Sequence, residues 1–148
     1  MNNLIRVALA TLVLMPVVAS AQSAASCPGL PGDAALKWEQ LAGPGFVFCR
    51  ALRSDGSEAF AVTLSADSPF EPSRVDRAEE ANIGGQEVHW YRSEIAGDPD
   101  AIARETLVEF GAGEKAHISL RAASDEQKAD AMRQVEALRF ADARLSSN

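Results

Sequence analysis

Alternation of apolar and polar residues predicts most of the regular structure of this chain. Residues 58–66 show it most clearly, because Phe60, Val62 and Leu64 fall on one face of an extended segment and small or polar residues fall on the other. Further stretches with strand character cover residues 46–53, 83–95, 103–110 and 115–122. The tetrapeptide GAGE joins the last two, and its glycines predict a β-hairpin.

A different period predicts a helix near the C-terminus. Ser124 and Gln127 have the spacing of a capping box, and the acidic residues 125 and 126 suit the positive end of a helix. The apolar residues of this segment fall within about a third of the circumference at about 3.6 residues per turn, and they are Ala131, Met132, Val135 and Leu138. We therefore expect this helix to pack on a sheet, with Phe140 at the edge of the core.

Two other segments carry weaker signals. Asp33 is placed to cap a short helix over residues 34–41, which Gly43-Pro44-Gly45 would end. Residues 67–82 contain two prolines and an acidic run, and they predict a loop with a helical turn. The expected fold class is α+β, an antiparallel sheet with a short N-terminal helix and a C-terminal helix packed on the sheet.

The first residues have the pattern of a secretory signal peptide. Arg6 precedes an apolar run over residues 7–18, and Ala19-Ser20-Ala21 is a small-x-small cleavage pattern. We expect residues 1–21 to be a signal peptide, residues 22–32 an extended lead-in and residues 33–148 a single domain in the periplasm or outside a bacterial cell. The alternative is an uncleaved anchor, although the run is shorter than the roughly 20 residues that span a bilayer.

The two cysteines, Cys27 and Cys49, predict a disulfide, because an exported chain with an even number of cysteines is most simply oxidised. Their separation does not resemble the closely spaced pairs of redox catalysts. Lipidation of Cys27 is the rival interpretation, but the residues before it, Ala24-Ala25-Ser26, lack the Leu or Val that lipoprotein signals usually carry.

The charge argues against nucleic acid as a partner. The chain has 14 Lys and Arg against 21 Asp and Glu, a formal net charge of −7, and no basic cluster stands out. Phosphate backbones and anionic membrane surfaces are bound mainly by basic charge. We therefore expect no nucleic acid partner and no integral membrane segment after processing.

Residues suited to catalysis are few, and we expect no catalytic residues, no cofactor and no metal. His89 and His117 lie on predicted strands, and they could share a metal only if those strands pair and a carboxylate joins them. No histidine-based metal motif, G-x-S-x-G elbow, P-loop or dinucleotide fingerprint is present. Two solvent-facing histidines are the favoured interpretation.

Aromatic residues in VHWYR suggest a partner surface at His89, Trp90 and Tyr91. On a strand, Trp90 shares a face with Val88, while His89 and Tyr91 share the other. The alternation does not decide which face is inward, and Trp90 in the core with His89 and Tyr91 on the surface is the alternative.

Several of these segments together resemble the PsbP-like α/β domains, known from thylakoid-lumen proteins and small bacterial exported relatives. They are the glycine-led strand NIGGQEVHW, the hairpin, the strand KAHISLRA and a last helix ending EALRF, within residues 58–140. The resemblance implies an antiparallel sheet flanked by helices and a role in assembly or binding. The Cys27/Cys49 pair is not part of that family's pattern, and no functional residue carries over.

The favoured hypothesis is a non-catalytic binding or accessory module of the cell envelope that engages an unknown protein or envelope component. One alternative is an inhibitor of a secreted enzyme, with residues 65–74 as the contact loop. The other, from a different class, is a small metal-dependent hydrolase that uses His89 and His117.

Overall fold

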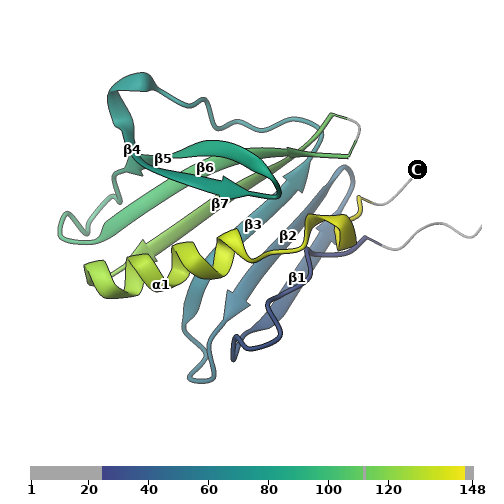
Figure 1. Ribbon diagram of the computed structural model, residues 1–148, viewed down its shortest axis with the longest axis horizontal. Coiled ribbons are helices and arrows are strands. Elements are labelled where there is room, and N and C mark those ends of the chain that lie inside the picture. The colour runs from purple at the N-terminus through teal and green to yellow at the C-terminus, as the bar shows by residue number, and fades with distance from the viewer. Residues whose placement is uncertain (1–24, 112, 146–148) are drawn as a thin grey trace, which may run out of the picture.

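A computed structural model describes residues 25–111 and 113–145. The expected signal peptide over residues 1–21 therefore lies outside the described residues. The described chain forms one antiparallel sheet of seven strands with one α-helix, α1, on one face (Figure 1). The strands are β1 (Lys37–Gly43), β2 (Phe46–Leu52), β3 (Glu58–Ser65), β4 (Arg77–Ile83), β5 (Gln86–Ser93), β6 (Ile102–Phe110) and β7 (Glu114–Ala122).

The sheet consists of two halves that meet at its centre. Its strand order is β1-β2-β3-β7-β6-β5-β4. After β3 the chain crosses to the far edge, makes a 3₁₀ turn at Arg74–Asp76, and returns strand by strand to β7. The halves join where residues 61–65 of β3 pair with residues 115–119 of β7. The long connection after β3 thus passes the full width of the second half.

The C-terminal helix is confirmed. α1 spans Asp125–Glu136, and the Ser124 hydroxyl accepts a hydrogen bond from the Gln127 N–H at 3.2 Å. The Gln127 side chain reaches back to the Ala123 N–H at 3.1 Å, which satisfies a second donor at this helix start. The expected apolar stripe is buried against the sheet, and Phe140 closes the core next to it.

The expected N-terminal helix is wrong, and with it the two-helix α+β arrangement. Residues 37–43 of that region form β1, paired along their whole length with β2. At about 100° per residue, Leu36 and Trp38 would point to opposite sides of a helix, so eight residues offered no apolar stripe. On a strand, Trp38 turns inward and packs edge-on against Phe60, with ring centroids 5.8 Å apart. Cross-strand pairing outweighs local helix propensity here.

The interpretation of residues 67–82 as a loop with a helical turn is only partly right. The turn is present as the 3₁₀ segment, but residues 77–83 form the edge strand β4. Glu79, Ala81 and Ile83 alternate toward the helix side, with Ile83 fully buried. The acidic residues concealed this alternation, because Glu79 takes an inward position that normally carries an apolar side chain.

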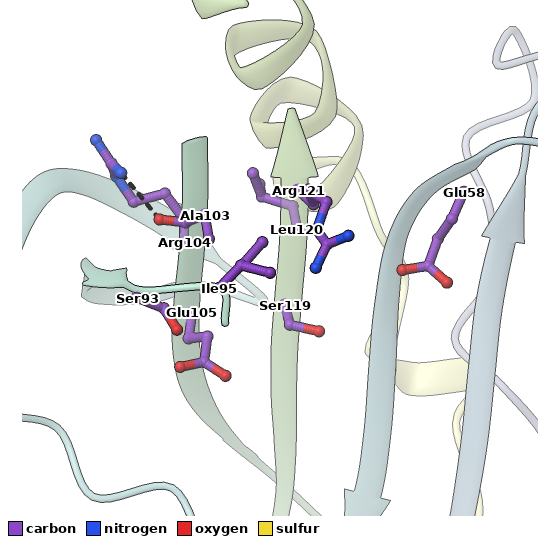
Figure 2. A pocket seen from close by; sticks show the side chains of 9 residues that line it. All are labelled: Glu58, Ser93, Ile95, Ala103, Arg104, Glu105, Ser119, Leu120 and Arg121. Atoms are coloured by element: carbon purple, nitrogen blue, oxygen red, sulfur yellow. Dashed lines mark hydrogen bonds between the residues drawn. The ribbon is translucent and has the colours of Figure 1, made fainter. Parts of the chain in front are cut away.

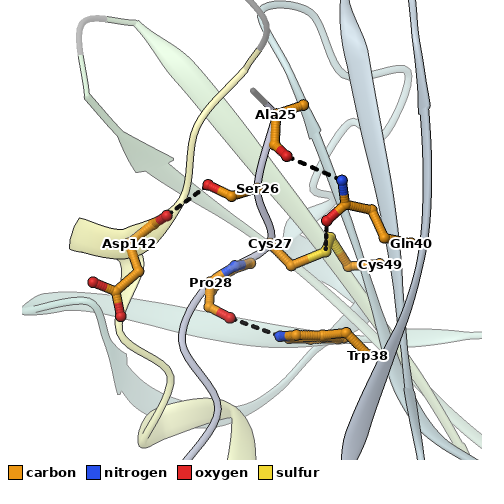
Figure 3. Close-up of a disulfide and its surroundings, with 8 residues drawn as sticks. All are labelled: Ala25, Ser26, Cys27, Pro28, Trp38, Gln40, Cys49 and Asp142. Atoms are coloured by element: carbon orange, nitrogen blue, oxygen red, sulfur yellow. Dashed lines mark hydrogen bonds between the residues drawn. A yellow bond between two sulfur atoms is a disulfide. The ribbon is translucent and has the colours of Figure 1, made fainter. Parts of the chain in front are cut away.

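The lead-in, residues 25–32, is an integral part of the fold. Ser26 and Gly29 each exchange backbone hydrogen bonds of 3.0 Å with the C-terminal tail, at Arg144 and Arg139. Trp38 donates from its indole nitrogen to the Pro28 carbonyl at 2.7 Å (Figure 3). The Cys27–Cys49 disulfide then ties this segment to β2. The first and last described segments therefore close the same side of the core.

A partly buried ion cluster fastens α1 to the second half of the sheet. Glu79 on β4 accepts hydrogen bonds from Arg104 on β6, at 2.8 and 3.1 Å, and from Lys128 on α1, at 3.0 Å. Burial raises the pKa of the Glu79 carboxyl, but the hydrogen bonds from Arg104 and Lys128 lower it more, to about 2 from an ordinary 4.5. The cluster thus favours the ionised carboxylate strongly.

We predict that Leu138→Ala lowers the free energy of unfolding by about 2–5 kcal/mol, because it empties a core position beside α1. Leu138 is 5% exposed. Leu41 is 63% exposed, so Leu41→Ala serves as a control of identical chemistry and should change stability by less than about 0.5 kcal/mol. Denaturant melts measure both, and equal effects would contradict the packing of this segment.

The Glu79 cluster predicts an acid-sensitive contribution to stability. A depressed pKa stabilises the fold fully above pH 4.5 and loses that effect as pH falls toward 2. The shift corresponds to about 3 kcal/mol, which solvent screening at this partly exposed group reduces to about 1–2 kcal/mol. Urea melts of Glu79→Gln should show this deficit at pH 7 and almost none near pH 2. Glu71→Gln, in the exposed connection, is the control, and a Glu79→Gln deficit independent of pH would contradict the prediction.

Candidate functional site

The face of the sheet opposite α1, here called the open face, carries the candidate site. α1 contacts β3, β4 and β7 from one side (Figure 1). Strand alternation turns a mixed set of aromatic, apolar and polar side chains to the other side. The set includes Leu41, Phe48, Thr63, Tyr91, Glu105, Leu107, His117 and Ser119, all of them exposed or half-buried.

Part of the open face is covered by an aromatic residue from the long connection after β3. The Phe70 ring stacks on the His117 imidazole, with centroids 4.9 Å apart and planes at 8°. It also meets Tyr91 edge-on at 5.8 Å. Since these partners stand on β7 and β5, Phe70 lies over the intervening strand β6. We call Phe70, Tyr91 and His117 the Phe70 cluster.

The two histidines lie apart and each faces a different carboxylate. His117 Nε2 lies 3.3 Å from a Glu105 carboxylate oxygen, but the angle is not that of a hydrogen bond, and the nitrogen has no other partner among the described residues. His89 Nε2 lies 3.5 Å from Glu80 on the neighbouring strand. β6 separates β5 from β7. The strand pairing that a shared metal site would require is therefore not made.

A groove of about 490 Å³ opens on this face beside the Phe70 cluster. It begins where the central seam ends, because β3 and β7 stop pairing after Ala61 and Ser119. Residues 58–60 and 120–122 continue with only their outer neighbours, β2 and β6. Figure 2 shows Ser119 and Arg121 projecting from β7 on the side of Glu58, with Glu105 on β6 across from them.

The charged side chains in the groove differ in how they are neutralised. Glu58 is held by Arg50, whose Nε donates to it at 2.9 Å. Glu105 has only the poorly aligned contact with His117. Arg121 has no carboxylate within ion-pairing distance in the part of the chain that the structure describes. One carboxylate and one guanidinium therefore face the groove without a strong partner.

The sites expected from the sequence are distributed as follows. The Cys27–Cys49 disulfide is confirmed. Trp90 is fully buried in the core on the helix side of the sheet, while His89 and Tyr91 lie half-buried on the open face. Trp90 therefore contributes no surface in this structure, and a partner surface at His89 and Tyr91 stays a prediction.

Sequence reasoning missed the groove residues Glu58, Glu105, Ser119 and Arg121, and it missed the stacking role of Phe70. The hairpin offered one usable signal. Once GAGE is taken as the turn between two strands, counting back from it places Glu105 opposite Ser119 and next to His117. The position of Phe70 depends on how a long connection crosses the sheet, which no local pattern encodes.

Comparison with known proteins returns no relative of this chain. No protein-family model, curated protein or solved structure matches it. Within residues 25–111 and 113–145, no three His, Cys, Asp or Glu side chains are grouped as metal ligands. In the same ranges, no helix has the length and apolar character needed to cross a membrane.

We predict that His89 and His117 do not bind zinc. Zinc held at about 100 times its dissociation constant would stabilise the fold by about 2.7 kcal/mol, so binding would be visible in a thermal melt. Zinc should shift the melting temperature of neither the wild type nor His89→Gln/His117→Gln. A rise with zinc that requires both histidines would contradict the prediction and favour a metal-dependent enzyme.

Proposed function

We propose that this protein is exported and acts in the periplasm or outside the cell as a non-catalytic binding module, with the open face as its binding surface. The observation that carries the proposal is the groove beside the Phe70 cluster on a sheet face that α1 leaves uncovered. A volume within about 300–1,000 Å³ is typical of small-ligand sites, and six of the nine residues that line this groove are polar or charged.

The disulfide supports the export part of the proposal. Disulfides persist in oxidising compartments and are rare in the cytosol. Cys49 is fully buried and Cys27 is 8% exposed, so the bond serves structure and not redox chemistry. The signal-peptide pattern of residues 1–21 points to the same compartment. The resemblance to PsbP-like domains, whose members mostly act in assembly or binding, adds to the proposal.

The chemistry of the open face argues for binding without catalysis. His117 is the residue best placed for acid–base work, but its Nε2 faces Glu105 and not a hydroxyl. No Ser, Thr or Tyr oxygen among the described residues is hydrogen-bonded to His117, as an activated nucleophile would require. One face of the His117 ring is covered by the stacked Phe70 ring. These contacts hold the imidazole in place as part of the surface.

An inhibitor of a secreted enzyme is the second candidate, because the loop over residues 65–74 is held in a defined shape. Phe70 pins its middle to the sheet, and the Phe70 N–H donates to the Ser68 hydroxyl at 3.2 Å. Val75, directly after this loop, is 83% exposed. A loop that is rigid before binding loses less entropy in a complex.

We predict that cross-links form from the open face and not from the helix side. A photo-cross-linking amino acid replaces Glu87 or Leu41 on the open face, or Glu126 on α1 as an equally exposed control. The protein is irradiated in intact cells. Export is checked by recovering the protein from the periplasmic or culture fluid and showing that residues 1–21 have been removed. Adducts of any mass are then identified by mass spectrometry. Cross-links from Glu126 alone would overturn the proposed surface.

A further inference from the structure

The groove on the open face has the arrangement of a site for a small molecule with two opposite charges. Its two weakly neutralised groups, Glu105 and Arg121, come from adjacent strands, and Ser119 stands between them. Glu105 lies directly opposite Ser119 in the β6–β7 register. Arg121 follows Ser119 by two residues on the same face of β7. The backbone positions of the two charged residues are therefore set by the sheet and not by a flexible loop.

The negative end of the groove suits a primary ammonium group. Such a group has three N–H donors and no acceptor. Glu105 offers a carboxylate, and Ser119, directly opposite it on β7, offers a hydroxyl oxygen. Two oxygen-bearing side chains on adjacent strands thus face this end of the groove. Ile95 also lines the groove and provides an apolar wall against which a side chain of the ligand would pack.

The positive end suits a carboxylate. A guanidinium binds a carboxylate through two parallel N–H donors, and Arg121 is exposed and without an ion-pair partner among the described residues. Glu58 stands near Arg121, but its charge is offset by Arg50 at 2.9 Å. Beyond Arg121 a second cavity begins, lined by Asp98 and Asp100. A ligand carboxylate would be repelled there, so Arg121 marks the end of the site.

The spacing of the two ends is compatible with a dipeptide. Glu105 and Arg121 stand on adjacent strands and two residues apart along them, so their Cα atoms are about 8 Å apart, at about 3.3 Å per residue and about 4.8 Å between strands. The two charged groups of an extended dipeptide can reach both side chains across this distance. Resting on the proposed function, we propose that the open-face groove binds a dipeptide, with its ammonium at Glu105 and its carboxylate at Arg121.

The test measures binding of leucyl-alanine, N-acetyl-leucyl-alanine and leucyl-alanine amide by calorimetry. The first compound carries both charges, and each of the others lacks one. Wild-type protein should bind the free dipeptide with a Kd of about 1 mM or tighter, and each blocked compound at least about tenfold more weakly. Because the protein is unchanged in these measurements, folding defects cannot produce this pattern.

Two variants assign each charge to its residue. Arg121→Gln should bind the free dipeptide and its amide equally, and Glu105→Gln should bind the free and acetylated dipeptides equally. Lys115→Gln and Glu109→Gln are matched controls on the same strands and the same face, and each should keep both preferences.

No binding of leucyl-alanine up to about 10 mM, well above the Kd expected here, would overturn the proposal. Equal binding of the free dipeptide and its amide by wild type would also overturn it, since the groove would then recognise only an amine. The proposal would also be overturned if Arg121→Gln and Glu105→Gln both still preferred the free dipeptide over its amide and over its acetylated form. If these results come with cross-links from Glu87 or Leu41, the dipeptide is wrong and the open-face function stands; cross-links from Glu126 alone remove the function itself.

Discussion

The short pairing between β3 and β7 is the interaction on which the rest of the molecule depends. Among the described residues, the strand pairing between the two halves of the sheet is confined to five residues of each strand, 61–65 and 115–119. The partners are far apart in the sequence, so the seam forms only after a large loop has closed. Each half is a meander of neighbouring strands that pairs locally. The pairing of β3 with β7 joins the two meanders into one sheet.

The incomplete seam explains why one face is covered and the other is hollow. Beyond Ala61 and Ser119 the strands separate, and this leaves Phe60 and Leu120 without a cross-strand backbone link between them. On one side α1 lies across β3 and β7 and buries these side chains with Met132. On the other side the same separation leaves the groove. The helix thus covers the break in pairing on one side, and the groove marks it on the other.

Two long-range attachments stabilise the halves outside the seam. The disulfide joins residues 22 apart and contributes about 3 kcal/mol in the chain-entropy model, acting on β2 and the lead-in. On the open face, Phe70 links the connection to β5 and β7 through aromatic contacts worth about 0.5–1.5 kcal/mol beyond burial. Neither attachment crosses the groove, so its charged residues remain accessible.

Alternation and capping predicted the elements whose side chains agree with their surroundings. β3, β7 and α1 are examples, because each has one apolar face and a clear start or end. β1 and β4 were missed because polar side chains interrupt the apolar alternation of these two edge strands. Gln40 on β1 and Glu79 on β4 are examples. Their structure comes from partners elsewhere: β2 and the lead-in for β1, and Arg104 and Lys128 for Glu79. A single sequence contains these residues but not their proximity.

The site was harder to predict than the fold because its residues are unremarkable when taken singly. Glu105 and Arg121 are two charges in a chain with 35 acidic and basic side chains, and only strand register brings them to one groove. The histidines drew attention by their chemistry, yet β6 separates their strands. Glu105 and Arg121 combine a place in the groove with the lack of a strong partner, while Glu58 in the same groove is held by arginine. A surface that recognises a charged ligand needs charged side chains that are not already paired within the protein. In this sheet the groove provides two such side chains, and their charges are opposite.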